Sequence, residues 1–305
     1  MTDGKDGSKT TDAYESFHVL SHELRLNILL ALNEAPNYAL TFSELQSEID
    51  EPNSGKFNYH LSMLEELYIE QIDNQYTLKY PGHRVIDASR SGAFQSPPEV
   101  GPVDVDGSCP DCGGAPRFTY KDYLGTVICG DCGNKLISYH IDPGAFTDCP
   151  VEEGIRAFDR WVKSTWRMAS DGVCFACGGK VQVSFVRTAD GPEHSQLYRD
   201  YFASDHPVLL ELDCTNCGFY SYIPTGARLL DATSTLGSVD KDLVDIQRKK
   251  IWEFHYIIDG DYVELVNENP WEVLIEVPTE ECRAEVKLDD NASIISATLN
   301  LEKSE

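Results

Sequence analysis

Two stretches in the middle of the chain decide its fold: Cys109-Pro-Asp-Cys112-Gly-Gly and Cys129-Gly-Asp-Cys132-Gly, with sixteen residues between the pairs. The pattern returns in Cys174-Phe-Ala-Cys177-Gly-Gly and Cys214-Thr-Asn-Cys217-Gly, now with thirty-six residues between the pairs. Two residues between cysteines allow both thiolates of one turn to reach a tetrahedral ion at about 2.3 Å. The first spacing is typical of a zinc ribbon, and the second repeats it with a longer loop.

We therefore predict two structural zinc ions per chain. The predicted ligands are Cys109, Cys112, Cys129, Cys132, Cys174, Cys177, Cys214 and Cys217. A glycine follows the second cysteine of every pair and permits the positive φ that turns amides toward sulfur. Disulfides, a thioredoxin-like redox pair and an iron–sulfur cluster remain alternatives. Cys149 and Cys282 are unpaired in sequence, and we expect ordinary buried thiols there.

Each cysteine set leads into two apolar stretches, so the sets resemble an internal repeat of two small β units. Such units are too small to bury a core of their own and need a metal to hold them. Four thiolates leave no open position for water, which disfavours metal-based catalysis. The sequence also lacks a P-loop, GxGxxG, HExxH and GxSxG motif. We expect a protein that is not an enzyme.

The composition indicates a folded, acidic protein. The 305 residues include 25 Lys and Arg against 51 Asp and Glu, a net charge of −26, while hydrophobic residues make up 41%. A disordered chain would be less hydrophobic. No run approaches eighteen apolar residues, and the first thirteen residues are polar, so we expect no membrane span, no secretory signal and a cytoplasmic location.

The charge argues against non-specific binding to phosphate at ordinary salt. In molar salt, however, the Debye length falls to about 3 Å and repulsion among carboxylates is screened. We therefore favour a salt-accumulating halophilic host, with an acidic protein that has a basic partner as the alternative. In such a host, DNA binding would rest on shape and base contacts.

The first ninety residues predict a helix-turn-helix followed by a wing. Apolar residues recur at helical intervals from Tyr14 to Leu32, and Thr41 with Glu44 forms a capping box that begins a second helix. A third helix runs from about Ser54 to Tyr68. The following segment, through Leu78, is expected to form a hairpin around Asp73-Asn74, and Pro81-Gly82 opens one more short helix.

The third helix has one apolar side, formed by Phe57, Leu61, Leu64 and Tyr68, which must face the core. No acidic residue occurs from Pro52 to Leu64. The candidate DNA-contacting residues are Ser54, Lys56, Asn58, Tyr59, His60 and Ser62. For His60 the first interpretation is packing at the boundary of the core, and DNA contact is the second. An ordinary solvated face is the alternative for Lys56, Asn58, Tyr59 and Ser62.

Residues 13–93 resemble the ArsR-like winged helix-turn-helix regulators of halophilic archaea. The motifs that carry the resemblance are Leu20-Ser-His-Glu-Leu-Arg-Leu-Asn-Ile-Leu, Ser54-Gly-Lys-Phe-Asn-Tyr-His-Leu and Tyr76-Thr-Leu-Lys-Tyr-Pro-Gly. Cysteine-pair ribbons often follow in that group, and the resemblance weakens beyond residue 230. It implies a dimeric transcriptional regulator that binds double-stranded DNA. No cysteine precedes Cys109, so the recognition helix lacks the Cys-x-Cys motif with which arsenic and cadmium sensors bind metal. The resemblance therefore does not imply heavy-metal sensing by that route.

The expected fold class is α+β. The predicted organisation is a disordered tail at 1–12, a winged helix-turn-helix domain at 13–94, a linker at 95–107, a first zinc ribbon at 108–148, a connecting amphipathic helix at 149–172, a second zinc ribbon at 173–225 and a C-terminal α+β region at 226–305. In that last region we expect a helix from Asp240 to Ile258 followed by an antiparallel sheet.

The connecting helix carries one apolar stripe: Ile155, Phe158, Val162, Trp166 and Ala169. Burial in its own domain is the first interpretation, and a dimer or ligand surface around Trp161 and Trp166 is the alternative. Two functions follow from the whole sequence. The chain is a DNA-binding regulator whose C-terminal part senses a signal or assembles the dimer, or it is a zinc-ribbon adaptor whose winged helix contacts proteins in transcription or RNA processing.

Overall fold

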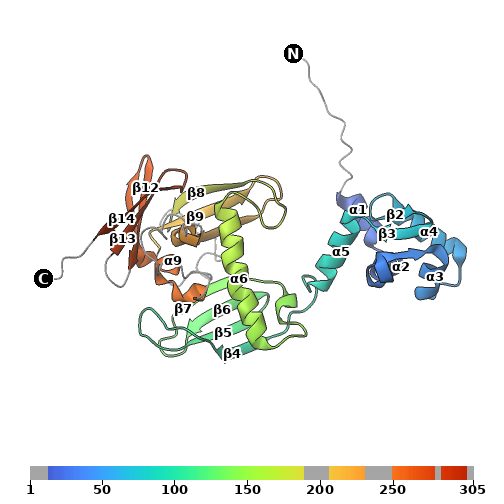
Figure 1. Ribbon diagram of the computed structural model, residues 1–305, viewed down its shortest axis with the longest axis horizontal. Coiled ribbons are helices and arrows are strands. Elements are labelled where there is room, and N and C mark those ends of the chain that lie inside the picture. Colours follow the sequence, from blue (N-terminus) through green and yellow to red (C-terminus); the bar gives the residue numbers. More distant parts are fainter. Residues whose placement is uncertain (1–12, 189–205, 231–248, 279–282, 301–305) are drawn as a thin grey trace, which may run out of the picture. The chain divides into compact units, whose positions relative to one another are not determined.

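The computed structural model describes residues 13–188, 206–230, 249–278 and 283–300. The chain divides into two compact units between Gln95 and Ser96 (Figure 1). Each unit has its own hydrophobic core. Both units combine helices with antiparallel sheets, so the predicted α+β class is confirmed.

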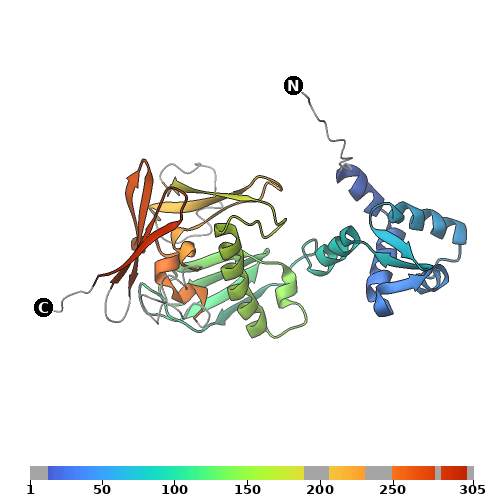
Figure 2. The same ribbon diagram turned by 45° about the horizontal axis from the view of Figure 1, so that its top comes forward.

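The first unit has the element order of a winged helix-turn-helix. Its elements are α1 (Ala13–Leu20), α2 (Glu23–Glu34), the 3-10 helix η1 (Pro36–Tyr38), β1 (Ala39–Thr41), α3 (Phe42–Glu48), α4 (Ser54–Glu65), β2 (Ile69–Ile72), β3 (Gln75–Leu78) and α5 (Tyr80–Arg90). The sheet has the antiparallel order β1-β3-β2. Figure 2 shows the helices of this unit around the β2–β3 hairpin. Helices α3 and α4 form the helix-turn-helix pair, and the hairpin is the wing.

The continuous helix predicted from Tyr14 to Leu32 is wrong, because the chain breaks at Ser21 and His22. The backbone of His22 is extended, with φ −123° and ψ 127°. Its imidazole Nδ1 accepts a hydrogen bond from the amide of Leu24 at 3.1 Å. This side chain satisfies one of the amides that have no partner at a helix start, so a new helix begins at Glu23.

The capping box and the hairpin turn predicted for this unit are confirmed, whereas the third helix ends at Glu65 and not at Tyr68. Thr41 and Glu44 form the capping box of α3. The hairpin turns at Asp73 and Asn74, whose φ angles are 47° and 67°, as a type I′ turn requires. The sequence did not reveal β1, which adds a third strand beside β3, because three residues are too few to show a period.

The second unit contains three antiparallel sheets. Its elements are β4 (Val100–Asp104), β5 (Pro116–Lys121), β6 (Leu124–Cys129), β7 (Lys135–His140), η2 (Pro143–Phe146), α6 (Val151–Ser170), β8 (Val181–Arg187), β9 (Val208–Cys214), β10 (Tyr220–Pro224), η4 (Thr225–Leu230), η6 (Ile251–Glu253), α9 (His255–Ile258), η7 (Gly260–Tyr262), β11 (Val263–Glu268), β12 (Trp271–Pro278), β13 (Arg283–Leu288) and β14 (Ile294–Asn300). The strand orders are β4-β5-β6-β7, β10-β9-β8 and β11-β12-β13-β14. Strand β4 pairs with β5, so the linker expected over 95–107 is shorter than predicted.

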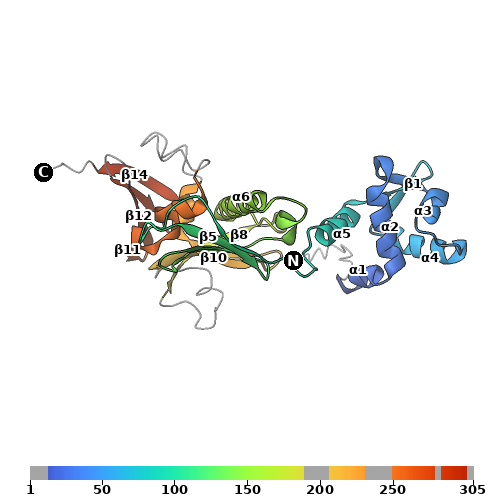
Figure 3. The same ribbon diagram turned by 90° about the horizontal axis from the view of Figure 1, so that it is seen from below.

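Helix α6 lies along one face of the first two sheets (Figures 1 and 3). The apolar stripe of the helix is buried throughout; Phe158, Val162 and Trp166 are each at most 1% exposed. A Cβ atom at Gly125 of β6 would lie 2.5 Å from the ring of Phe158, so the sheet approaches the helix too closely for a side chain there. Burial of the stripe within the unit is confirmed; of the alternative surface around Trp161 and Trp166, the part played by Trp166 is wrong, while Trp161 is 39% exposed.

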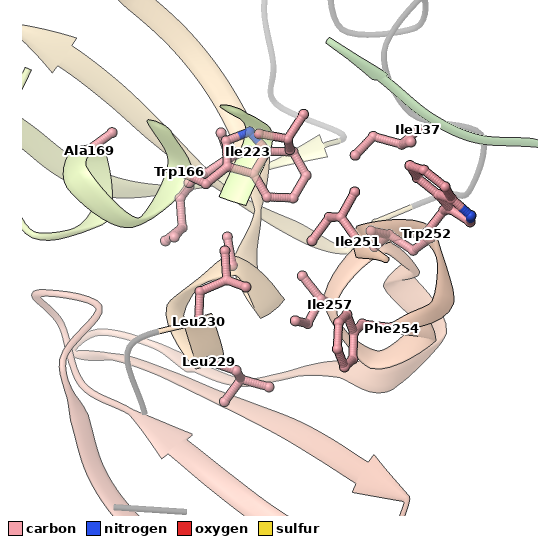
Figure 4. Close-up of a cluster of buried hydrophobic side chains, with 14 of the residues drawn as sticks. Ile137, Trp166, Ala169, Ile223, Leu229, Leu230, Ile251, Trp252, Phe254 and Ile257 are labelled. Atoms are coloured by element: carbon pink, nitrogen blue, oxygen red, sulfur yellow. The ribbon is translucent and has the colours of Figure 1, made fainter. Parts of the chain in front are cut away.

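One core unites both cysteine-bearing sheets, α6 and the C-terminal sheet. In Figure 4, Trp166 and Ala169 of α6, Ile223 of β10, Leu229 and Leu230 of η4 and four residues of 251–257 gather in one cluster. The prediction that neither ribbon buries a core alone agrees with this shared packing. None of the helices in the described part of the chain combines the length and the hydropathy that crossing a membrane requires.

The C-terminal region forms the expected four-stranded sheet. Of the helix predicted from Asp240 to Ile258, residues 240–248 lie outside the described residues. Its described part is not one helix, because Phe254 adopts φ −95° and ψ 79° between η6 and α9. The short helix α9 packs against β12.

Truncating Trp166 to alanine should lower the free energy of unfolding of the second unit by about 3–5 kcal/mol, because the residue is 1% exposed in the shared core. Denaturant unfolding followed by circular dichroism measures the change. Ser164→Ala, on the exposed side of α6, is the control and should change little. Equal effects of the two substitutions would show that α6 does not hold this core together.

Candidate metal centres and nucleic-acid interface

The eight predicted cysteine ligands gather into two groups of four. Within each group all Sγ atoms lie within 4.8 Å of one another. Cys112 and Cys129 are 3.4 Å apart and Cys109 and Cys132 3.7 Å in the first group; Cys177 and Cys214 are 3.6 Å apart and Cys174 and Cys217 3.7 Å in the second. A tetrahedral zinc with bonds of about 2.3 Å has ligand sulfurs about 3.8 Å apart. The sulfur spacing therefore fits zinc.

All four cysteine turns are built in the same way. The amide of the glycine after each pair donates to the carbonyl of the first cysteine over 2.7 to 3.1 Å. The φ angles of these glycines lie between 71° and 77°, and a Cβ would meet nothing within 4 Å. Glycine is required there by the backbone conformation and not by lack of space. The positions of these turns, before β5 and β8 and after β6 and β9, confirm the internal repeat.

The two groups also share a pattern of burial. The first cysteine of every pair is buried, at most 2% exposed, and the second is exposed. The amide of Cys132 donates toward Cys129 Sγ at 3.4 Å and is the main reason that the pKa of Cys129 falls to about 6. The side-chain amide of Asn216 has the same effect on Cys177, whose pKa is also about 6. Thiolates are the form that binds metal, and these donors stabilise one thiolate in each group, whereas the neighbouring cysteines raise the pKa of Cys132 and Cys217 to about 12.

The cysteine clusters are thus consistent with two structural zinc sites, each closed by four protein ligands. A bound zinc would act there as a cross-link between the turns. The ninth described cysteine, Cys149, is half-buried and not fully buried as expected, with its thiol 3.3 Å from the carbonyl of Ala145. Cys282 lies outside the described residues.

The outer side of α4 is the second candidate site. Phe57, Leu61, Leu64 and Tyr68 are buried, as the helical pattern predicted. Ser54, Lys56, Asn58, Tyr59 and Ser62 are exposed. The exposed fraction of Tyr59 is 59%. Helix α4 contains no carboxylate side chain before Glu65. Contact of these five residues with DNA stays a prediction.

Lys56 is engaged within the unit, which the sequence did not reveal. Its Nζ lies 2.7 Å from Oε2 of Glu51, in the turn before α4. This hydrogen bond holds the pKa of Glu51 below its ordinary value. A ligand that uses Lys56 must therefore compete with Glu51.

His60 does not belong to the exposed set, because it is only 6% exposed. Its ring centroid lies 4.0 Å from that of His22 and 5.2 Å from that of Tyr59. The packing interpretation of His60 agrees with this position, at the contact between α2 and α4.

The molecule is thus a two-unit protein with a winged-helix arrangement and twin four-cysteine centres. A family model described as "Domain of unknown function (DUF7351)" matches residues 106–294, and the chain belongs to that family. A second model, described as "Domain of unknown function (DUF7347)", matches residues 13–89, which span α1 to nearly the end of α5. No curated protein and no solved structure matches the chain.

Purified, reduced protein should contain about two zinc ions per chain. Cys112→Ser and Cys177→Ser should each remove one ion, and the double variant should remove both, because each cluster needs four thiolates. Elemental analysis after gel filtration counts the metal, and Cys149→Ser is the control that should keep both ions. A wild-type value near zero, or iron in place of zinc, would contradict the assignment.

Proposed function

We propose that this protein is a DNA-binding transcriptional regulator of the ArsR-like winged-helix kind, which binds duplex DNA as a homodimer. Helix α4 enters the major groove, and the zinc-binding unit senses a signal or assembles the dimer. The observation that carries the proposal is the exposed outer side of α4, which offers hydroxyl, amide and phenol groups and no carboxylate before Glu65. These groups suit contacts with base edges and phosphates.

The charge of the first unit sets the conditions for such binding. Residues 13–95 hold 12 Asp and Glu against 5 Lys and Arg, so the unit repels DNA at low salt. Screening in molar salt removes most of that repulsion over distances beyond about 3 Å. Affinity then rests on the direct contacts of α4, which supports a salt-rich cytoplasm as the working environment.

One observation favours the adaptor function as a second candidate. The wing carries Glu70 and Asp73 but no lysine or arginine between Ile69 and Leu78, and Ile72 at its tip is 54% exposed. An acidic wing with an apolar tip suits a protein partner better than a phosphate backbone. Binding of a randomised duplex library in molar KCl separates the two, because an adaptor would select no sequence.

Lys56→Ala combined with Asn58→Ala should abolish binding to a duplex selected from such a library, measured by fluorescence anisotropy in molar KCl. The two side chains are exposed on α4, so the fold should be unchanged. Arg84→Ala with Asn27→Ala removes one positive charge and one side-chain amide from other exposed positions and should bind like wild type. Unchanged binding of the α4 variant would remove α4 as the recognition helix.

Glu51→Gln should strengthen DNA binding a few-fold, because it releases Lys56 from its ion pair with Glu51. Glu48→Gln, at an exposed position of α3, removes the same charge without touching Lys56. Anisotropy with the selected duplex compares the two variants. A similar gain in both would mean that only the overall charge matters and that Lys56 does not meet the DNA.

A further inference from the structure

Among the lysines and arginines of residues 13–95, Arg25 alone has no partner in the described part of the chain. The other four lysines and arginines each have one: Lys56 pairs with Glu51, Arg84 with Asp87, Arg90 with Glu34, and Lys79 donates to the carbonyls of Glu65 and Glu66. Arg25 has no hydrogen bond or ion pair with any residue that the structure describes, although the chain is rich in acids.

The lack of a partner is costly because Arg25 is only 7% exposed. Its Nε is completely enclosed without a hydrogen-bond acceptor. A buried charge without a counter-ion normally costs several kcal/mol, and natural proteins avoid it. Of the guanidinium nitrogens only Nε is fully enclosed in this way, so the terminal nitrogens are the ones available to an acceptor from outside the unit.

Further cationic and imidazole groups gather at the same contact between α2 and α4. His22 and Arg25 lie three residues apart at the start of α2, and Lys56 and His60 lie four residues apart on α4, so each pair shares a face of its helix. The rings of His22 and His60 are 4.0 Å apart and join the two faces. Nδ1 of His60 is also enclosed without a partner.

The electrostatics of His60 agree with an excess of positive charge. Burial lowers the pKa of His60, and the nearby His22, Arg25 and Lys56 lower it further. Glu51 opposes them, but it is already bonded to Lys56. Glu23, in the first turn of α2, is exposed. An anion brought to this contact would relieve the repulsion.

The position of the contact on α4 indicates which anion that is. Tyr59 lies on the outer side of α4, and His60 lies about 100° further round the helix. A helix of about 10–12 Å diameter fills a major groove about 12 Å wide, so its flanks face the two sugar-phosphate backbones. When the outer side of α4 faces the bases, the flank with His60 faces a phosphate.

We propose that Arg25, His22 and His60 form a binding site for one backbone phosphate of the duplex in each protomer. The inference rests on the proposed function and adds a contact that positions the recognition helix without reading sequence. The terminal nitrogens of Arg25 donate to the non-bridging phosphate oxygens, and Nε2 of His60 donates beside them.

The test measures the affinity of full-length protein for the selected duplex and for a scrambled duplex in molar KCl. Arg25→Met should weaken binding to both about tenfold, the value of one charge-assisted hydrogen bond, and Arg25→Lys should recover part of the loss. Arg84→Met removes the same charge from an exposed ion pair on α5 and should bind like wild type. A loss confined to the selected duplex would mean a base contact and overturn the proposal.

Neutral methylphosphonates placed one at a time along the selected duplex identify the phosphate. At one position in each half-site, the neutral linkage should weaken wild type about tenfold and Arg25→Met not at all. If Arg25→Met does not fold, His60→Gln replaces it in this comparison. Equal losses in wild type and variant at every position would overturn the site.

Two further outcomes separate the proposals from one another. If inorganic phosphate at constant ionic strength displaces the duplex from wild type but not from Arg25→Met, and no methylphosphonate position distinguishes the two, the cluster binds a free anion and the duplex assignment is wrong. If wild type binds no duplex, the proposed function fails together with this inference. If wild type binds and Arg25→Met binds equally well, only the inference fails.

Discussion

The second unit depends on one constraint. In each cluster, four cysteine sulfurs must be arranged as a tetrahedron around one metal ion. In each cluster four sulfurs lie within 4.8 Å of one another, and four thiolates at that distance repel strongly unless a cation lies between them. Each cluster joins the turn before one strand to the turn after the next, β5 with β6 and β8 with β9. A metal ion bound at each cluster would therefore couple to the folding of these hairpins, in addition to the packing of the shared core.

The shared helix makes the two ribbons a single body. Helix α6 buries Phe158 beside β6, packs against β8, and places Trp166 in the cluster with η4 and η6. Lys163 Nζ donates a hydrogen bond to the buried Asp159 carboxylate at 3.0 Å. The same carboxylate accepts a hydrogen bond from the amide of Ile251 at 2.7 Å, so polar contacts also hold η6 against α6. Because close-packed interiors transmit strain, loss of one metal should disturb the packing around the other through α6.

The parts of the structure that could be predicted are those set by neighbours in the sequence. The cysteine spacing, the capping box of α3, the Asp73-Asn74 turn and the apolar stripe of α6 each depend on residues within a few positions of one another. Strand β4 was missed because its Pro- and Gly-containing sequence resembles a linker, and its partner β5 supplies the reason for extended structure. His22 was missed as a helix start because imidazole is not among the favoured capping side chains.

The candidate DNA surface shows the same division between local and tertiary information. Helical periodicity was enough to separate buried Phe57 and Leu61 from exposed Asn58 and Tyr59. It could not show that Lys56 is paired with Glu51, or that His60 meets His22, because these contacts depend on the conformation of the turn before α4 and on how α2 packs against α4.

An acidic protein that binds DNA must keep its few cations from being neutralised by its own carboxylates. In the first unit three of the five lysines and arginines already pair with an acid, and Lys79 is held by backbone carbonyls. Arg25 is 7% exposed and has no ion pair with an acid among the residues that the structure describes, so burial has kept this one cation from being neutralised within the unit. In the proposed phosphate site an arriving anion would compensate the unfavourable burial of Arg25, so part of the free energy of binding would be stored in the fold.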